Sequence, residues 1–205
     1  ESTNKINMPS LLNRCLFMNE QILNRWEKRK LHTKQLLKET TLEILLEKGF
    51  TELTIQDIAD RGDLSRGTFY LHFASLEEIV WMIVEESLDR ATKEVLTSFH
   101  VWKRLFQFTQ DHRLLLKVLF GEKGHPYFAK QIENYLVTII NKSIQDGSFK
   151  PDLAKGLPLE FSTQFVTGSL VRLIIWSLDK DYSADQLGQY YYEMLYREPM
   201  PESYR

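Results

Sequence analysis

The chain has 205 residues, of which 43% are hydrophobic and 26% are charged, and its formal net charge is −2. This length allows one domain or two small ones with a buried core, and the composition is ordinary for a soluble protein. No apolar run approaches the ~20 residues of a membrane span, and no signal peptide is evident. The single cysteine, Cys15, leaves no internal disulfide. These features predict a cytoplasmic protein without membrane contact.

Residues 1–30 are interpreted as an N-terminal extension. Residues 1–9 are polar and indicate a tail, whereas apolar residues between positions 11 and 26 recur at approximately helical spacing and indicate a short extra helix. A basic cluster, Lys28 to Lys30, follows directly. Two interpretations of this cluster stay open: an ordinary solvated face, or an arm that contacts phosphates or the minor groove of DNA.

A first helix of the next segment is predicted from about Thr33 to Lys48. Its end is indicated by Gly49 followed by the apolar Phe50, the pattern of a Schellman stop. Four apolar residues share its inner face: Leu36, Leu37, Ile44 and Leu45.

Two short helices joined by a turn are predicted next. Thr54 and Asp57 have the spacing of a capping box and begin the first, whose N-terminus is also a natural phosphate site. Residues 61–63 form the turn, where glycine takes a positive φ freely and aspartate tolerates it. Ser65 caps the second helix, which two aromatic residues anchor to the core, Phe69 and Phe73.

The exposed side of this second helix carries side chains that suit contact with DNA. We expect Arg66 to read a guanine, because a guanidinium can donate to both O6 and N7. Thr68, Tyr70 and His72 are expected at phosphates, and Leu71 either meets a base edge or packs against a helix. The candidate DNA-binding residues are Lys28, Arg29, Lys30, Lys34, Thr54, Ser65, Arg66, Gly67, Thr68, Tyr70, Leu71 and His72.

Segment 33–80 resembles the DNA-binding domain of the TetR family of one-component bacterial regulators. The resemblance implies an all-α protein of about nine helices. Its three-helix DNA-binding head with a helix-turn-helix would occupy residues 31–75, and a helical bundle for effector binding and dimerisation would occupy residues 76–205. The residues that carry the resemblance are Lys48-Gly49-Phe50, Thr54, Ile58-Ala59, Ser65, Gly67-Thr68-Phe69-Tyr70 and His72-Phe73.

The sequence departs from the family pattern at two positions. The family commonly has a lysine that holds a phosphate where this chain has Leu76, and Glu77 and Glu78 follow it. Two carboxylates suit a helix N-terminus but repel DNA. Asp63 stands where the family often has a turn glycine, and this substitution is expected to cost little.

The remainder of the chain is predicted to be helical. A long helix begins at Ser75, which forms a capping box with Glu78, and extends toward Phe99. Glycine, proline and capping residues separate the later helices, which are expected at residues 101–109, 112–120, 126–146, 157–179 and 183–197.

The last two predicted helices carry apolar stripes that indicate a dimer interface. In TetR-like proteins these helices pair with their mates in a four-helix bundle; burial against the chain's own core is the alternative. The candidate interface residues are Phe161, Phe165, Gly168, Ser169, Leu187, Tyr191 and Met194.

The resemblance also implies an apolar effector pocket between the helices of the bundle. Arg172 stands alone in an apolar run, so that it either forms an interface ion pair or binds an anionic effector. Most aromatic residues of this region would also fit an ordinary core. The candidate effector-binding residues are Phe106, Phe120, Tyr127, Tyr135, Arg172 and Trp176.

No catalytic, metal-ligating or phosphate-loop pattern is present, so we expect no enzyme activity, cofactor or metal. The expected function is that of a homodimeric repressor, which binds a palindromic operator through recognition helices about 34–36 Å apart and is released by a small-molecule effector. The alternative is an interaction subunit with the same fold that acts through a partner protein and binds DNA weakly or not at all. Residues 76–78 motivate this alternative.

Overall fold

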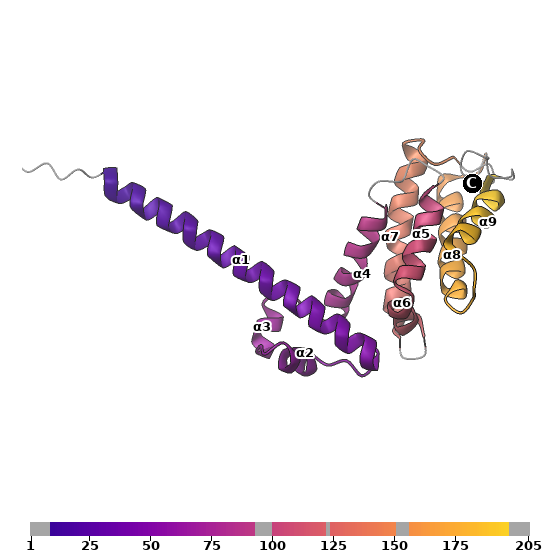
Figure 1. The fold of residues 1–205 in the computed structure, drawn as a ribbon. Helices are drawn as coiled ribbons and strands as arrows, with labels where there is room; N and C mark the ends of the chain where they lie inside the picture. The colour runs from indigo at the N-terminus through magenta and orange to yellow at the C-terminus, as the bar shows by residue number, and fades with distance from the viewer. Residues whose placement is uncertain (1–8, 93–99, 122–123, 151–155, 197–205) are drawn as a thin grey trace, which may run out of the picture.

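The computed structural model of the chain describes residues 9–92, 100–121, 124–150 and 156–196, with side chains from residue 24 onward. These residues are helical, with short connections and no strands (Figure 1). The helices are α1 (Pro9–Lys48), α2 (Ile55–Arg61), α3 (Arg66–Tyr70), α4 (Leu76–Thr92), α5 (His100–Asp111), α6 (Arg113–Phe120), α7 (Pro126–Gln145), α8 (Leu159–Ser177) and α9 (Ala184–Tyr196).

The first helix differs from the prediction. A separate short helix before residue 30 and a new start near Thr33 were expected, but α1 is one continuous helix of 40 residues. It begins with Pro9, and no glycine or proline interrupts it before Gly49, so nothing in the backbone ends the helix at the basic cluster. At 1.5 Å per residue α1 is about 60 Å long, and its N-terminal half projects away from the other helices (Figure 1).

Helices α1, α2 and α3 form the head of the molecule. The C-terminal half of α1 ends at Gly49, whose φ of +83° and N–H bond to Leu45 O (2.9 Å) confirm the predicted stop. Helices α2 and α3 lie along one side of α1 (Figure 1). Their inner residues are buried with those of α1, and these residues are Leu37, Leu45, Ile58, Phe69 and Phe73.

Helices α4 to α9 form the body. Helix α5 packs along α9 and α7 packs along α8, while α4 contacts both α1 and the body. The predicted extension of α4 beyond Thr92 toward Phe99 lies outside the described residues. No helix in the described ranges is long and apolar enough to cross a bilayer.

Head and body share one buried core. Phe50, just after α1, packs edge-on against Phe128 of α7 with ring centroids 4.8 Å apart, and against His125 at 5.5 Å. A second link joins α1 to α4, where Lys38 Nζ lies 2.7 Å from Glu86 Oε2. The head is therefore connected to the body through α1 as well as through the chain that leads into α4.

Candidate nucleic-acid interface

The start of α2 forms the predicted capping box. Asp57 N–H donates to Thr54 Oγ1 (3.1 Å), and the Asp57 carboxylate accepts from both the backbone N–H and the hydroxyl of Thr54. Lys48 Nζ also lies 2.6 Å from Asp57 Oδ2, and these bonds hold the pKa of Asp57 below its ordinary value. Both polar groups of Thr54 are thus engaged, so a phosphate at this helix N-terminus would compete with the Asp57 carboxylate.

The turn between α2 and α3 uses the aspartate rather than the glycine for its left-handed residue. Gly62 has a φ of −84°, whereas Asp63 has a φ of +49°. Leu64 N–H then donates to Ala59 O (2.9 Å), which fixes the approach of the chain to α3. Because this turn sets the angle between the two helices, Asp63 helps to orient the recognition helix.

Helix α3 has a buried side and an exposed side, as the predicted recognition helix requires. Phe69 is fully buried, and Phe73, which follows the helix, is nearly so. Arg66 is exposed, and Tyr70 and Leu71 are 53% and 79% exposed. Two aromatic side chains thus fix α3 in the core and leave these three side chains to solvent.

The N-terminus of α3 is capped by Ser65, whose Oγ accepts from Thr68 N–H at 3.0 Å. The two hydroxyls of Ser65 and Thr68 are also hydrogen-bonded at 2.9 Å. Gly67 is exposed and lies between them in sequence, and an added Cβ there would meet only Ser65 Oγ at 3.5 Å. The surface at this helix N-terminus is therefore made of small polar groups.

His72 lies between α3 and the basic part of α1. Burial lowers the pKa of His72, and the positive charges of Lys30 and Lys34 lower it further. Lys34 Nζ is 5.7 Å from the ring centroid of Phe73, and Lys30 Nζ is 5.3 Å from that of Trp26. The structure therefore places part of the basic cluster of α1 beside the recognition helix.

The basic side chains of the head divide into two groups. Lys38, Lys48 and Arg61 are neutralised by carboxylates; Arg61 pairs with Glu47 through hydrogen bonds of 2.5 and 2.8 Å. Within the described part of the chain, the other group has no carboxylate partner, and its members are Arg25, Lys28, Arg29, Lys30, Lys34 and Arg66. All of them except Arg25 belong to the predicted DNA-binding set.

Leu76, which stands where the family commonly has a lysine, lies in apolar surroundings. Leu76 is partly buried and packs against the core. The carboxylate of Glu78 accepts from Ala74 N–H, while Glu78 N–H donates to Ser75 Oγ at 3.2 Å. One of the two carboxylates at this helix start therefore caps the backbone.

The predicted effector-binding residues are not brought to one place. Phe106 is buried beside Tyr191, and Tyr135 of α7 bonds to Thr92 and Asp89 of α4. Phe120 and Tyr127 are half-buried against the core. Arg172 and Trp176 point outward from α8. A cavity of about 390 Å³ lies elsewhere, between α1, α4 and the start of α6, and none of the six residues lines it.

The predicted dimer residues also separate into two groups. Leu187 and Tyr191 are buried within the chain, where Tyr191 Oη donates to Val166 O at 2.8 Å and is hydrogen-bonded to Ser169 Oγ at 2.9 Å. These two apolar side chains have almost no surface left for a partner, because they pack in the chain's own core. The remaining apolar residues, Phe161, Phe165 and Met194, are 58%, 48% and 60% exposed, and Gly168 is exposed too.

The exposed part of α8 and α9 forms a continuous aromatic surface. The rings of Trp176 and Tyr182 are 5.5 Å apart, and those of Tyr182 and Tyr190 are 6.3 Å apart, which links the two helices. We call this surface the outer face; it comprises Phe161, Phe165, Arg172, Trp176, Tyr182, Tyr190 and Met194. The candidate interface residues predicted from the sequence did not include Tyr182 or Tyr190, because the apolar pattern does not show which tyrosines are exposed. No cluster of side chains that could hold a metal ion occurs among the described residues.

Two family models match the chain over most of its length. The model described as bacterial regulatory proteins of the tetR family matches residues 37–80, which contain the last part of α1, α2, α3 and the start of α4. A model described as a transcriptional regulator C-terminal region matches residues 97–195.

Known proteins of the same kind resemble the chain as a whole. The transcriptional repressor KstR2 of Mycobacterium tuberculosis H37Rv is 27% identical over 182 residues, which cover 76% of this chain and 86% of the relative. The crystal structure of a TetR transcriptional regulator from Streptococcus agalactiae 2603V matches with a TM-score of 0.69 and 19% identity, covering 85% of this chain and 99% of that one. The regulator FadR from Bacillus subtilis, solved with stearoyl-CoA, matches with a TM-score of 0.52, 20% identity, and coverage of 79% and 97%.

Proposed function

Because this chain belongs to the TetR family of bacterial transcriptional regulators, we propose that it is a repressor that binds a palindromic operator as a homodimer. The observation that carries the proposal is the arrangement of α3, which buries Phe69 and Phe73 and exposes Arg66, Tyr70 and Leu71. Repression is supported by the similarity to KstR2, which is a repressor.

In this proposal Arg66 reads a base in the major groove, and the polar and basic side chains around it contact the phosphate backbone of the DNA. An exposed guanidinium without a carboxylate partner can donate to O6 and N7 of guanine without first breaking an ion pair. Lys28, Arg29, Lys30 and Lys34 contact phosphates from α1, which therefore acts as a rigid helical arm. The phosphates of the DNA strand beside α3 are contacted by Ser65, Gly67, Thr68, Tyr70 and His72.

Dimerisation in this proposal uses the outer face of α8 and α9. An exposed aromatic surface of this extent is typical of a protein contact. Two-fold symmetry would set the two α3 helices about one turn of DNA apart. A small molecule that favours a different spacing of the heads would release the operator. The structure of the similar regulator FadR with stearoyl-CoA supports control by a bound small molecule.

The decisive experiment is binding of the purified protein to the DNA that flanks its own gene, titrated across salt concentration. We expect sequence-specific binding with a steep salt dependence. Arg66→Ala should weaken specific binding by about 1–3 kcal/mol and relax the preference at one base position. Lys28→Gln should weaken binding to all sequences and reduce the salt slope by about 1.

Lys130→Gln provides the matched control, because Lys130 is an exposed cation on α7, outside the head. It should leave operator binding unchanged. If the wild-type protein binds DNA weakly and without sequence preference, the operator proposal fails. The chain would then act as an interaction subunit through a partner protein. Glu77 would fit this alternative, because its carboxylate does not cap the helix and would repel DNA.

A further inference from the structure

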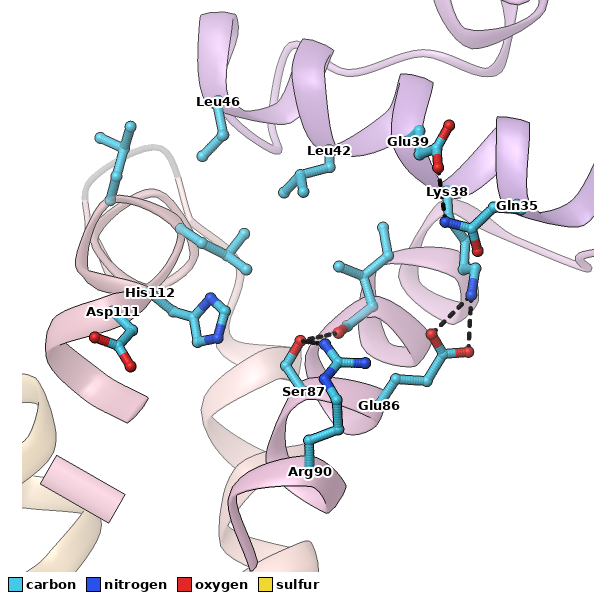
Figure 2. A pocket seen from close by; sticks show the side chains of 13 residues that line it. Gln35, Lys38, Glu39, Leu42, Leu46, Glu86, Ser87, Arg90, Asp111 and His112 are labelled. Atoms are coloured by element: carbon cyan, nitrogen blue, oxygen red, sulfur yellow. Dashed lines mark hydrogen bonds and ion pairs between the residues drawn. The ribbon is translucent and has the colours of Figure 1, made fainter. Parts of the chain in front are cut away.

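The cavity of about 390 Å³ lies between head and body, away from the predicted effector residues. One wall comes from α1, the opposite wall from α4, and the end wall from the α5–α6 corner (Figure 2). Its volume falls within the range of small-molecule sites. The residues that line it are far apart in the sequence, and no pattern in the chain predicted their meeting.

One side of the cavity is apolar. Leu42 and Leu46 of α1 extend into it from above in Figure 2. Leu114 and Leu115 of α6 also line it; Leu115 is buried, whereas Leu114 is 61% exposed. These side chains offer an apolar surface to the apolar part of a ligand.

The other side carries hydrogen-bonding groups. Lys38 Nζ lies 2.9 and 2.7 Å from the two carboxylate oxygens of Glu86, so this pair is neutral overall. Arg90 has one described hydrogen bond, from its Nη2 to Ser87 Oγ at 2.8 Å, and within the described residues it has no carboxylate partner. Arg90 is therefore the cation of this cavity that is open to an anionic ligand.

His112 adds a neutral polar group between these two sides (Figure 2). Burial lowers the pKa of His112, so that its imidazole is largely uncharged near pH 7. The neighbouring Asp111 accepts from Gln107 Nε2 at 2.8 Å, and Glu39 accepts from Gln35 Nε2 at 2.8 Å. Of the three acidic residues that line the cavity, Asp111 and Glu39 are thus hydrogen-bonded within their own helices, and Glu86 is paired with Lys38.

We propose that this cavity binds a small amphipathic carboxylate. Its apolar part packs between Leu42, Leu46 and Leu115, and its carboxylate accepts hydrogen bonds from Arg90. A dianionic ligand is disfavoured, because Glu39, Glu86 and Asp111 also line the cavity and Arg90 is, among the described residues that line it, the one cation without a carboxylate partner.

Occupancy of this site affects the position of the head. A ligand that touches Leu42 and Leu115 together spans α1 and α6, so its affinity depends on the distance between them. By thermodynamic reciprocity, a ligand that prefers one arrangement of head and body changes the affinity for DNA by the same factor as DNA changes the affinity for the ligand. This effect on DNA rests on the proposed function, whereas binding of the carboxylate does not.

Binding is tested with octanoate as the probe, measured by calorimetry and by displacement of the fluorescent anion 8-anilinonaphthalene-1-sulfonate. We expect saturable binding by the wild-type protein. Arg90→Gln should weaken it by about tenfold, because a charge-assisted hydrogen bond is lost. Leu114→Asp, at a position exposed enough to tolerate the change, should weaken it similarly by placing a carboxylate at the mouth. Lys130→Gln removes an exposed cation outside the cavity and should bind as the wild type does.

Two results would overturn the proposal. One is the absence of saturable octanoate binding to the folded wild-type protein; the other is equal binding by the wild type, Arg90→Gln and Leu114→Asp. Circular dichroism of each variant shows whether it is folded. If one of Arg90→Gln and Leu114→Asp does not fold, octanoate binding by the other decides between the two results.

The coupling is tested by operator titrations with and without saturating octanoate. At an octanoate concentration that just saturates the wild type, we expect a change in operator affinity of at least about fivefold in the wild type and a smaller change in Arg90→Gln, which binds octanoate more weakly. Octanoate binding without any change in operator affinity would overturn the coupling. Octanoate binding by a protein that recognises no operator would overturn the proposed function and leave the cavity site intact.

Discussion

Asp63 holds the turn of the helix-turn-helix in a conformation that few residues adopt. Its φ of +49° lies in the left-handed region, where a Cβ crowds the backbone and aspartate is tolerated better than most residues. Because Gly62 takes an ordinary negative φ, the strain falls on the side chain at position 63. The stability of the turn therefore depends on the residue type at this position.

The Asp63→Ala variant should be less stable than the wild type by about 1 kcal/mol, because alanine keeps the Cβ and loses the short polar side chain. Asp63→Gly should be as stable as the wild type or slightly more stable, since glycine adopts this φ freely. Urea denaturation of the three proteins measures both differences. Equal stability of the alanine and glycine variants would show that the turn carries no strain.

We expect His72 to make DNA binding depend on pH. Its pKa in the free protein is lowered by burial and by Lys30 and Lys34, so the imidazole is largely neutral near pH 7. A phosphate beside it favours the charged form and raises this pKa, so that binding takes up a proton. Operator affinity should therefore rise as the pH falls from about 7 toward the lowered pKa of the free protein.

His72→Gln is the matched variant for this pH dependence. In parallel titrations of operator binding at constant ionic strength, it should show a flatter pH profile than the wild type. An identical slope in the two proteins would remove His72 from the phosphate contact. The same lowered pKa affects folding: the stability from neutral His72 is present above the ordinary histidine pKa and is lost as the pH falls through the lowered value.

At the scale of elements, α5 and α9 approach each other closely at Gly188. A Cβ added to Gly188 would lie 2.9 Å from Lys103 N and 3.0 Å from Lys103 Cα, so the two helices could not keep their separation. The contact lies beside the buried ring of Tyr191, which packs against Trp102 at 4.9 Å. Gly188 is thus a packing residue of the body.

Gly188→Ala should destabilise the protein by about 1–3 kcal/mol, because backbone atoms of α5 must move. Gly168→Ala is the matched control, since an added Cβ at Gly168 of α8 meets no atom within 4 Å and the helix gains up to about 1 kcal/mol in propensity. Chemical denaturation under identical conditions compares the two. The packing argument would fail if both variants were equally stable.

At the scale of the whole molecule, we expect the outer face of α8 and α9 to mediate the proposed dimerisation. Phe161, Phe165 and Met194 expose about half of their surface or more, which is unusual for apolar residues gathered in one region. Arg172 lies on the same face, so its lone charge in an apolar run fits a position at the interface better than one inside a pocket.

Phe165→Asp should weaken dimerisation by about a hundredfold or more, since it removes an apolar contact and buries a charge. Sedimentation velocity at several protein concentrations measures the change, and operator affinity should fall with it. Leu114→Asp places the same charge at an exposed leucine on α6, outside the outer face, and should remain dimeric. A Phe165→Asp protein that stays dimeric would move the interface elsewhere.

Local signals in the sequence predicted the elements well. The capping box at Thr54–Asp57 forms as expected; Ser183 and Gln186 form another before α9, and Pro126 begins α7. Such signals depend on atoms within one turn of the helix, so the local sequence contains all of their partners. The start of the first helix was predicted wrongly: residues 10–48 contain neither proline nor glycine, the residues that strongly disfavour a helix interior, and the helix runs through the whole segment.

The sequence by itself determined the all-helical fold, the helix-turn-helix and the polar side of α3. These features follow from helical periodicity and capping, which are local properties of the chain. Only the tertiary structure decided which cations are neutralised, which aromatic side chains face inward, and where a cavity lies. Lys38 and Glu86, or Leu42 and Leu115, are distant in sequence, and their contacts arise when whole helices pack. Burial depends on how the helices pack together, so the sequence could not show that Tyr191 is buried whereas Tyr190 is exposed.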